Sequence, residues 1–151
     1  MSAFTPQDPD YINKVKDSFQ RQHAMATIGT RIHKLQPGLV ELAFDYDARL
    51  TQQHGFIHAG IVSTVMDSAC GYAGFSLMPE NTAVLTIEFK VNLLAPAQGE
   101  SFVAVGKVKK PGRTITVADG ELYAIKDGQR KLVATMTGTL MTIANRDDVK
   151  G

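Results

Sequence analysis

The chain has 151 residues, close to the usual size of one domain, so we expect one folded domain across residues 1–151. Its 16 Lys and Arg nearly cancel its 15 Asp and Glu, and the net charge of +1 lacks the basic excess that binding nucleic-acid phosphates requires. We therefore expect no nucleic-acid partner. Polar residues interrupt the longest apolar stretch, residues 57–78, so we also expect no membrane span.

Cysteine usage and the start of the sequence favour a cytoplasmic location. The one cysteine, Cys70, cannot form a disulfide within the chain, and no charged-then-apolar leader opens the sequence. We interpret Cys70 as a small buried apolar residue and not as a nucleophile.

The first half of the chain predicts a helix followed by a hairpin. Residues 10–25 are mostly helix formers with apolar residues at helical spacing, which predicts an amphipathic lead helix on the outside of a sheet. Residues 27–35 and 39–46 are rich in β-branched side chains and meet at the turn pair Pro37-Gly38.

The rest of the chain predicts one long helix and about four strands. Residues 55–78 carry two adjacent apolar stripes four residues apart, which indicates a helix buried on most of its circumference. Residues 85–93 alternate apolar and polar, the pattern of a strand with one face toward a core. Turn pairs then separate three segments that read as sequential hairpins: 101–109, 113–125 and 131–143.

This order predicts an α+β domain in which an antiparallel sheet of about six strands wraps around one central helix. We expect the ends, residues 1–9 and 145–151, to be flexible.

A short segment before the central helix carries the strongest signal. Residues 52–60 read Gln-Gln-His-Gly-Phe-Ile-His-Ala-Gly, and Asp67 follows within the helix. With this segment and about residues 52–100, the chain resembles the PaaI-like branch of the hotdog thioesterases. That branch has an Asn and a Gly before a His-Gly-Gly that opens the helix, and an acid nine positions after the His. His58, Ala59, Gly60 and Asp67 have this spacing.

The resemblance implies the hotdog fold and hydrolysis of an acyl-CoA thioester to acid and free CoA, with no cofactor beyond the CoA of the substrate. It implies a homodimer that can pair into a tetramer, and it gives Thr86 the role of assisting the acid. The chain departs from the family at two positions: Gln52 replaces the Asn, which weakens a side-chain donor role, and Ala59 replaces the first Gly but keeps the backbone N–H.

The chemistry can also be argued from the residues. Thioester hydrolysis needs donors for the developing oxyanion and a base or nucleophile for the attack. A helix that begins near His58 leaves the N–H groups of Ala59 and Gly60 free at its positive end, so we assign them as oxyanion donors and give His58 a positioning role. Asp67 is the lone charge in a buried helix, and we assign it as general base or nucleophile.

Other candidates have a weaker signal. Gly55 and Phe56 precede the helix, and Glu88 is expected on the same polar strand face as Thr86; all three are candidate substrate contacts. Lys110 and Arg113 flank Pro111-Gly112 and suit CoA phosphates, although charges on turns are more often simply solvated. An apolar acyl pocket is expected from a further set: Phe56, Met66, Tyr72, Phe75 and Met78. His54 and His58 lack a third nearby ligand, so we expect no metal.

Helix geometry predicts that two chains share each site. Nine residues separate His58 from Asp67, which places them roughly 13 Å apart along the helix and on about opposite faces. One chain therefore cannot aim both ends at one carbonyl. Two other functions of the fold remain as alternatives, a hydratase or dehydratase and a non-catalytic acyl-CoA binder, but the Asp-x-Asn-Pro pattern of the hydratases is absent and no DNA-binding module precedes the first strand.

Overall fold

The computed structural model describes residues 3–151 and contains one antiparallel sheet and three α-helices. The elements follow in chain order as α1 (Tyr11–Arg21), α2 (His23–Ile28), β1 (Arg31–Gln36), β2 (Leu39–Asp45), a short 3-10 helix (Ala48–Leu50), α3 (Ala59–Phe75), β3 (Thr82–Leu93), β4 (Ser101–Lys110), β5 (Ile115–Lys126) and β6 (Gln129–Ala144). The strand order is β1-β2-β4-β5-β6-β3. The predicted α+β architecture with a six-stranded sheet is confirmed.

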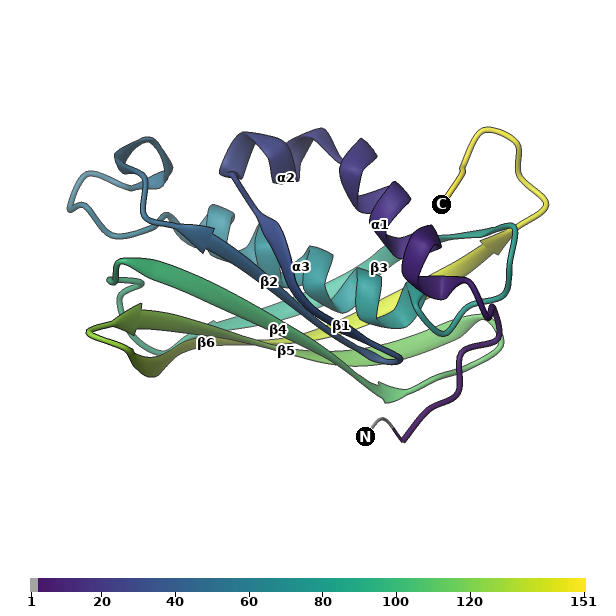
Figure 1. Ribbon diagram of the computed structural model, residues 1–151. Helices are drawn as coiled ribbons and strands as arrows, with labels where there is room; N and C mark the ends of the chain where they lie inside the picture. Colours follow the sequence, from purple (N-terminus) through teal and green to yellow (C-terminus); the bar gives the residue numbers. More distant parts are fainter. Residues whose placement is uncertain (1–2) are drawn as a thin grey trace.

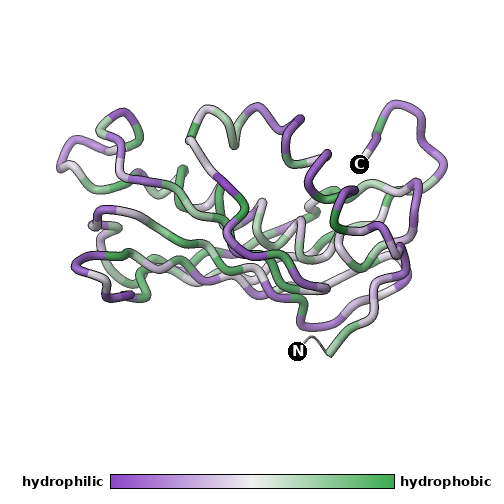
Figure 2. The backbone as a smooth tube through the Cα atoms, in the orientation of Figure 1, coloured by the Kyte–Doolittle hydropathy of each residue, from purple (hydrophilic) through white to green (hydrophobic). Residues whose placement is uncertain are grey.

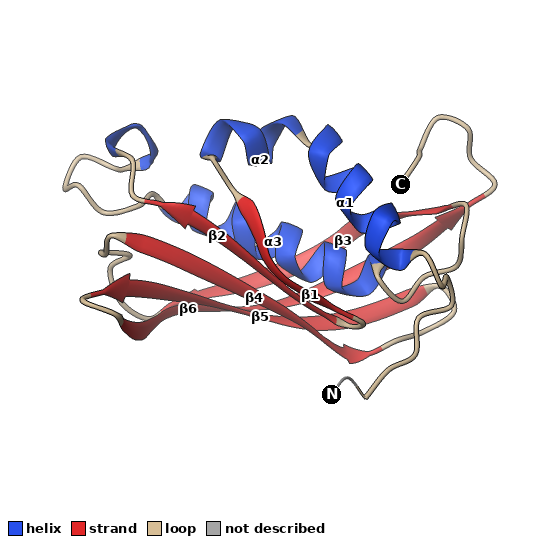
Figure 3. Cartoon of the chain, viewed as in Figure 1, coloured by secondary structure: helices blue, strands red, loops and turns tan. Residues whose placement is uncertain are grey.

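The sheet curves around α3, and the two N-terminal helices lie on the other side of α3, so the molecule has three layers (Figures 1 and 3). The predicted place of the lead helix on the sheet is therefore wrong, because its apolar face covers α3 instead: Phe19 packs edge-on against Tyr72 with ring centroids 5.8 Å apart. The predicted continuous helix is also interrupted. Gln22 has an extended backbone (φ −84°, ψ 95°) and separates α1 from α2.

The central helix α3 lies unusually close to the sheet. Its residues Val65, Ala69 and Ala73 are fully buried. A Cβ atom at Gly106 of β4 would come within 2.2 Å of the Ala69 backbone, and one at Gly120 of β5 within 3.0 Å of the Cys70 sulfur. Only glycine fits at Gly106, so this glycine of the sheet determines how closely α3 can approach β4.

The predicted hairpins are confirmed. β1 pairs with β2 through the turn at Pro37-Gly38, where Gly38 has φ +75°, and β4, β5 and β6 pair in sequence. β3 does not join its neighbour β4 but pairs with β6 at the far side of the sheet. The long strand is therefore an edge strand.

A β-bulge at Ile87 changes the face to which β3 side chains point. Before the bulge, Thr86 stands opposite Leu140 of β6, whose buried side chain faces α3. After the bulge, Glu88 stands opposite Thr139, and Phe89 stands opposite Gly138. An unpaired residue shifts the alternation by one, so Thr86 and Phe89 face α3 while Glu88 faces away. The expectation that Thr86 and Glu88 share a face is wrong for this reason.

Several large apolar side chains of β3 stay outside the core of this chain, contrary to the alternation pattern, although Ala83 is buried and Val84 and Val91 pack against the core. Leu85, Ile87, Phe89 and Leu93 are 44 to 57% exposed. Leu94, just after the strand, is 57% exposed as well. A row of apolar side chains along an unpaired sheet edge is a surface suited to pairing with another chain.

Hydrophilic residues gather in α1, in the turns and in the segment after β6 (Figure 2). Across residues 3–151, none of the helices combines the length and apolar character needed to cross a membrane.

Candidate active site

The carboxylate of Asp67 and the hydroxyl of Thr86 form the centre of the site. Asp67 is the middle residue of α3 and is half-buried, and Thr86 reaches it from β3. The Thr86 hydroxyl donates to Asp67 Oδ1 at 2.8 Å. The bulge at Ile87 allows this contact. Because of the extra residue, Thr86 before the bulge and Phe89 after it both point toward α3. No side chain or backbone group among residues 3–151 donates to Oδ2 of Asp67.

Burial raises the pKa of Asp67 above its ordinary value, and the hydrogen bond from Thr86 opposes that shift in part. Desolvation disfavours the charged carboxylate, whereas a donor favours it. A carboxylate whose pKa is raised is a stronger base once it is ionised, which suits proton transfer from water.

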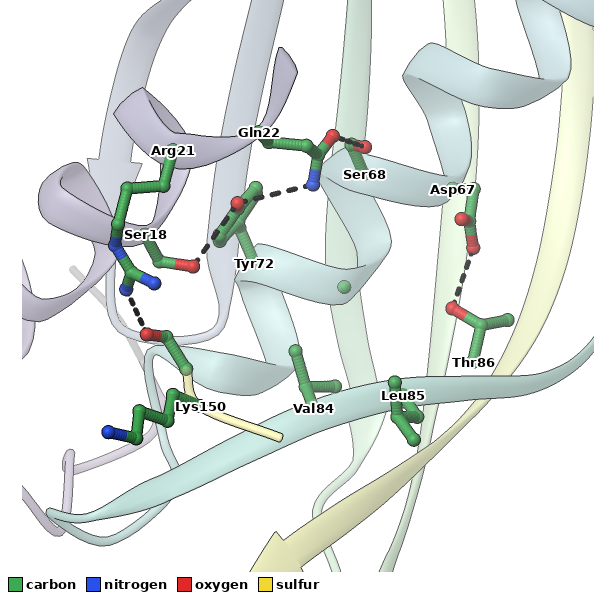
Figure 4. Close-up of a pocket in the computed structure, with 12 residues that line it drawn as sticks. Ser18, Arg21, Gln22, Asp67, Ser68, Tyr72, Val84, Leu85, Thr86 and Lys150 are labelled. Carbon is green, nitrogen blue, oxygen red and sulfur yellow. Dashed lines mark hydrogen bonds between the residues drawn. The ribbon is translucent and has the colours of Figure 1, made fainter. Parts of the chain in front are cut away.

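Asp67 and Thr86 line a pocket of about 420 Å³ between α1, α3 and β3 (Figure 4). Val84 of β3 forms an apolar wall, Leu85 beside it points its side chain away from the pocket, and the opposite wall is polar (Figure 4). The polar side chains come from α1, from the break after it and from α3: Ser18, Arg21, Gln22, Ser68 and Tyr72. Residues Lys150 and Gly151 close one end, where Arg21 donates to the Gly151 carbonyl.

Of the two N–H groups assigned as oxyanion donors at the start of α3, one is free and one is engaged. His58 is the N-cap, and its Nδ1 accepts the N–H of Gly60 at 2.8 Å. The N–H of Gly60 is therefore engaged by the cap in this arrangement, and its role as an oxyanion donor stays a prediction. The N–H of Ala59 has no acceptor among residues 3–151, and it sits at the first position of the helix, where the dipole is positive.

The loop before α3 forms a second pocket, of about 450 Å³. Gln52, Phe56 and Ala59 line it together with apolar residues of β3 and of the segment that follows, including Leu93 and Leu94. The side-chain oxygen Oε1 of Gln52 accepts the backbone N–H of His54. The side-chain NH₂ of Gln52 is therefore the group that can donate into the pocket. Gly55 shapes the loop with φ +82°.

The acid and the free amide therefore line different pockets of the same chain. The Asp67 pocket and the Ala59 pocket have no lining residue in common. They lie near opposite ends of β3, which contributes Thr86 to the first and Leu93 to the second.

The remaining predicted residues lie elsewhere. Glu88 is on the outer face of β3, and Arg113 lines a shallow hollow with Pro79, beyond the C-terminal end of α3. Lys110 is the last residue of β4, at that same end. The roles of these three in substrate binding stay predictions. The expected acyl-pocket set is divided: Tyr72 lines the Asp67 pocket, Phe56 lines the Ala59 pocket, and the others are core residues, namely Met66, Phe75 and Met78.

Sequence reasoning missed the polar contribution of the lead helix. Ser18 of α1 and Gln22, the residue directly after that helix, are four residues apart, and Ser68 and Tyr72 have the same spacing on α3. Polar residues at i and i+4 on the inner face of a helix were a usable signal, because such a face normally carries only apolar residues.

Comparison with known proteins agrees with this geometry. Residues 54–131 match the family described as the thioesterase superfamily. The crystal structure of a thioesterase family protein from Silicibacter pomeroyi is 62% identical, covers 89% of this chain and 99% of that chain, and has a TM-score of 0.88.

More distant relatives share the fold. The E. coli PaaI protein from the phenylacetic acid degradation operon has a TM-score of 0.81 at 19% identity, over 92% of this chain and 97% of that one. The medium/long-chain acyl-CoA thioesterase YigI of Escherichia coli is 23% identical over 76% of this chain and 81% of its own length. The chain has the hotdog fold of PaaI and belongs to the thioesterase superfamily.

Proposed function

We propose that the protein hydrolyses an acyl-CoA thioester to the free acid and CoA, at sites that two chains share. The observation that carries this proposal is the separation of the two pockets: each holds one half of what thioester hydrolysis requires, and neither holds both. The acyl-CoA thioesterase activity in the name of YigI supports the choice of substrate.

Antiparallel pairing of two β3 edges joins the halves. Thr86 lies near the start of the strand and Leu93 at its end, so a second copy running in the opposite direction places its Ala59 pocket beside the first chain's Asp67 pocket. The same pairing covers the exposed apolar residues of the edge and satisfies its open backbone groups. We propose a homodimer of this kind as the smallest active form, able to pair further.

The reaction then follows from the geometry. The Asp67 carboxylate takes a proton from water as the water oxygen attacks the thioester carbon, or attacks that carbon itself and is later released by water. Thr86 holds Oδ1, which leaves Oδ2 for the reacting atom. The oxyanion that develops on the carbonyl accepts the N–H of the partner's Ala59, where the helix dipole favours negative charge. The tetrahedral intermediate collapses with loss of the CoA thiolate, which takes up a proton, and the overall reaction consumes only water and involves no cofactor.

The test is a hydrolysis screen with purified protein over aromatic and straight-chain acyl-CoA esters, reading released thiol. We expect turnover on at least one ester, and Asp67→Asn is expected to reduce it by about two or more orders of magnitude because the base or nucleophile is lost. Asp119→Asn is the matched control, since Asp119 of β5 is about half exposed, pairs with Lys109 at 3.5 Å and lines neither pocket. Thiol release no faster than in buffer, or an Asp67→Asn variant that keeps more than a third of the activity, would reject the proposal.

A further inference from the structure

A chain of hydrogen bonds crosses the Asp67 pocket on its polar wall. The Ser68 hydroxyl donates to Gln22 Oε1 at 2.7 Å, Gln22 Nε2 donates to the Tyr72 hydroxyl at 3.2 Å, and the Tyr72 and Ser18 hydroxyls are 3.3 Å apart. The chain begins at Ser68, the residue after Asp67, and runs away from the acid (Figure 4). It also spans the break between α1 and α2, because Gln22 is the residue of that break.

The hydrogens of this chain do not balance within the protein. Ser18 and Tyr72 have one hydroxyl hydrogen each, and the contact between them uses only one. If Tyr72 donates to Ser18, the Ser18 hydrogen is left; if Ser18 donates, the Tyr72 hydrogen is left. No other acceptor for either lies among residues 3–151. Burial raises the pKa of Tyr72, so the phenol stays protonated at neutral pH and the surplus donor persists.

This surplus donor lies where an acyl group would end. Asp67 and Thr86 mark the end of the pocket where the thioester carbonyl must sit, and Ser18, Tyr72 and Arg21 lie at the other end (Figure 4). Val84 of β3 points into the space between them and gives it apolar surface. An acyl group that enters from the acid would thus cross an apolar stretch and meet donors at its tip.

We propose that Ser18, Gln22 and Tyr72 determine substrate specificity by binding an oxygen atom at the far end of the acyl group. The occupant is an acyl chain with a hydroxyl or carbonyl oxygen at its tip, and a saturated chain of equal length is disfavoured. A saturated tip would remove water from the surplus hydroxyl without replacing the hydrogen bond, which costs free energy. Sites that are built to hydrogen-bond a substrate oxygen reject the analogue that lacks it for this reason.

This inference rests on the proposed function for the orientation of the acyl group, but its test does not require turnover. We would measure Kd by calorimetry for straight-chain acyl-CoA esters of four, six and eight carbons, each with and without a hydroxyl on the terminal carbon. The protein is the full chain with Asp67→Asn, which prevents hydrolysis during the titration. At the chain length that reaches the cluster, we expect the hydroxylated ester to bind about tenfold more tightly, the value of one hydrogen bond in a desolvated site.

The variants assign the preference to the cluster. Tyr72→Phe, added to Asp67→Asn, keeps the ring and removes the hydroxyl, and we expect the ratio of the two Kd values to fall to about one. Tyr123→Phe is the matched control: the Tyr123 hydroxyl donates to Glu121 on β5, away from both pockets, so the ratio should not change. Gln22→Met is the second variant, since it removes the donor to Tyr72 without loss of length, and it should lower the ratio as well.

Equal Kd values for the hydroxylated and plain esters at every length would overturn the inference. A preference that survives both Tyr72→Phe and Gln22→Met would also overturn it, because the oxygen would then be bound elsewhere. A preference seen in a protein that hydrolyses no ester would refute the proposed function and leave the specificity cluster standing. Hydrolysis of acyl-CoA esters without any preference for the hydroxylated ester would support the proposed function and refute the specificity cluster.

Discussion

The two pockets of the chain have nearly the same size and opposite chemistry. The Asp67 pocket has an acid, hydroxyls and an amide, whereas the Ala59 pocket is mostly apolar and offers the free N–H of a helix start. The first can move a proton but has no fixed donor aimed at an oxyanion from a helix terminus, and the second can stabilise an oxyanion but has no base. This difference indicates that neither pocket is a complete catalytic site, and that the chain alone should be inactive.

The largest effect on the comparison is expected from deleting the backbone donor of the Ala59 pocket, the N–H of Ala59. Ala59→Pro does so cleanly, because proline lacks the N–H yet is well accepted at the first helical position, and the backbone of His58 (φ −59°, ψ 138°) suits a residue before proline. We expect kcat to fall by about 10²- to 10³-fold, as when one oxyanion donor is lost. Unchanged circular dichroism would verify the fold. Activity within threefold of the unmodified chain would show that the Ala59 amide has no part in the reaction.

Mixing two inactive chains tests whether the pockets meet across an interface. Asp67→Ala chains and Ala59→Pro chains, dissociated gently and reassembled together, should form mixed dimers in which one of the two sites is intact. Random assembly makes half of the dimers mixed, so recovery to about a quarter of full activity is expected on that symmetry argument. Verified mixed dimers without activity would place both halves within one chain, against the separation of the pockets.

The interface itself can be tested at the exposed edge. Ile87→Lys places a charge in the apolar row of β3, where the side chain is 55% exposed, and burying an unpaired charge there is costly. We expect light scattering to show a shift from dimers to single chains, with activity lost in parallel. Ile12→Lys on α1, which is 43% exposed, is the control that should change neither. A dimer that survives Ile87→Lys would direct attention to another surface.

A smaller effect is expected from Thr86→Val, which removes the hydrogen bond that holds the Asp67 pKa down while burial continues to raise it. The reaction needs the carboxylate, so activity is present above the pKa of Asp67 and is lost as the pH falls through it. The acid limb of the kcat/KM profile should therefore move to higher pH in Thr86→Val and return in Thr86→Ser. An unmoved acid limb would mean that Asp67 does not set it.

The smallest effect concerns stability and has the opposite sign to the loss of activity. Because the folded state raises the pKa of Asp67, it binds the proton more tightly than the unfolded chain, so stability is gained as the pH falls through the folded pKa and is forfeited at neutral pH. Asp67→Asn should thus melt at a slightly higher temperature than the unmodified chain at pH 7, and the difference should shrink at pH 4. A lower melting temperature at pH 7 would show that the carboxylate contributes favourable contacts.

The sequence predicted the pieces that depend on local pattern. The turn pairs located the hairpins, and the two stripes of the central helix located α3, because both signals act over a few neighbouring residues. The segment with His58 and Ala59 also located the start of α3, and the role of Asp67 as the acid stays a prediction. The sequence could not show that His58 would occupy Gly60, since a side-chain cap depends on a rotamer and not on spacing.

Features that depend on contacts between distant parts of the chain could not be predicted, for a different reason. The alternation of residues 85–93 was read as one face toward a core, but a bulge at Ile87 exchanges the faces and the partner strand β6 comes from the end of the chain. Nothing in the local pattern marks a bulge that lacks a glycine. The hydrogen bond between Ser68 and Gln22 in the polar wall of the Asp67 pocket could not be predicted either, because the two residues are 46 positions apart in the sequence.

The glycines of the sheet beneath α3, Gly106 and Gly120, have a consequence for how the substrate range of this protein could change. Gly106 leaves no room between β4 and the backbone at Ala69, so α3 cannot be lowered, and any side chain there would lift the helix that carries Asp67. Space for a bulkier substrate is therefore expected from the opposite layer, by shortening the side chains of Ser18 on α1 and Gln22 at the helix break or by moving that break outward. The sheet and α3 thus hold Asp67 in a fixed position, whereas the side of the pocket formed by α1 and the helix break can vary. New substrate selectivity can arise on that variable side while the position of Asp67 is kept.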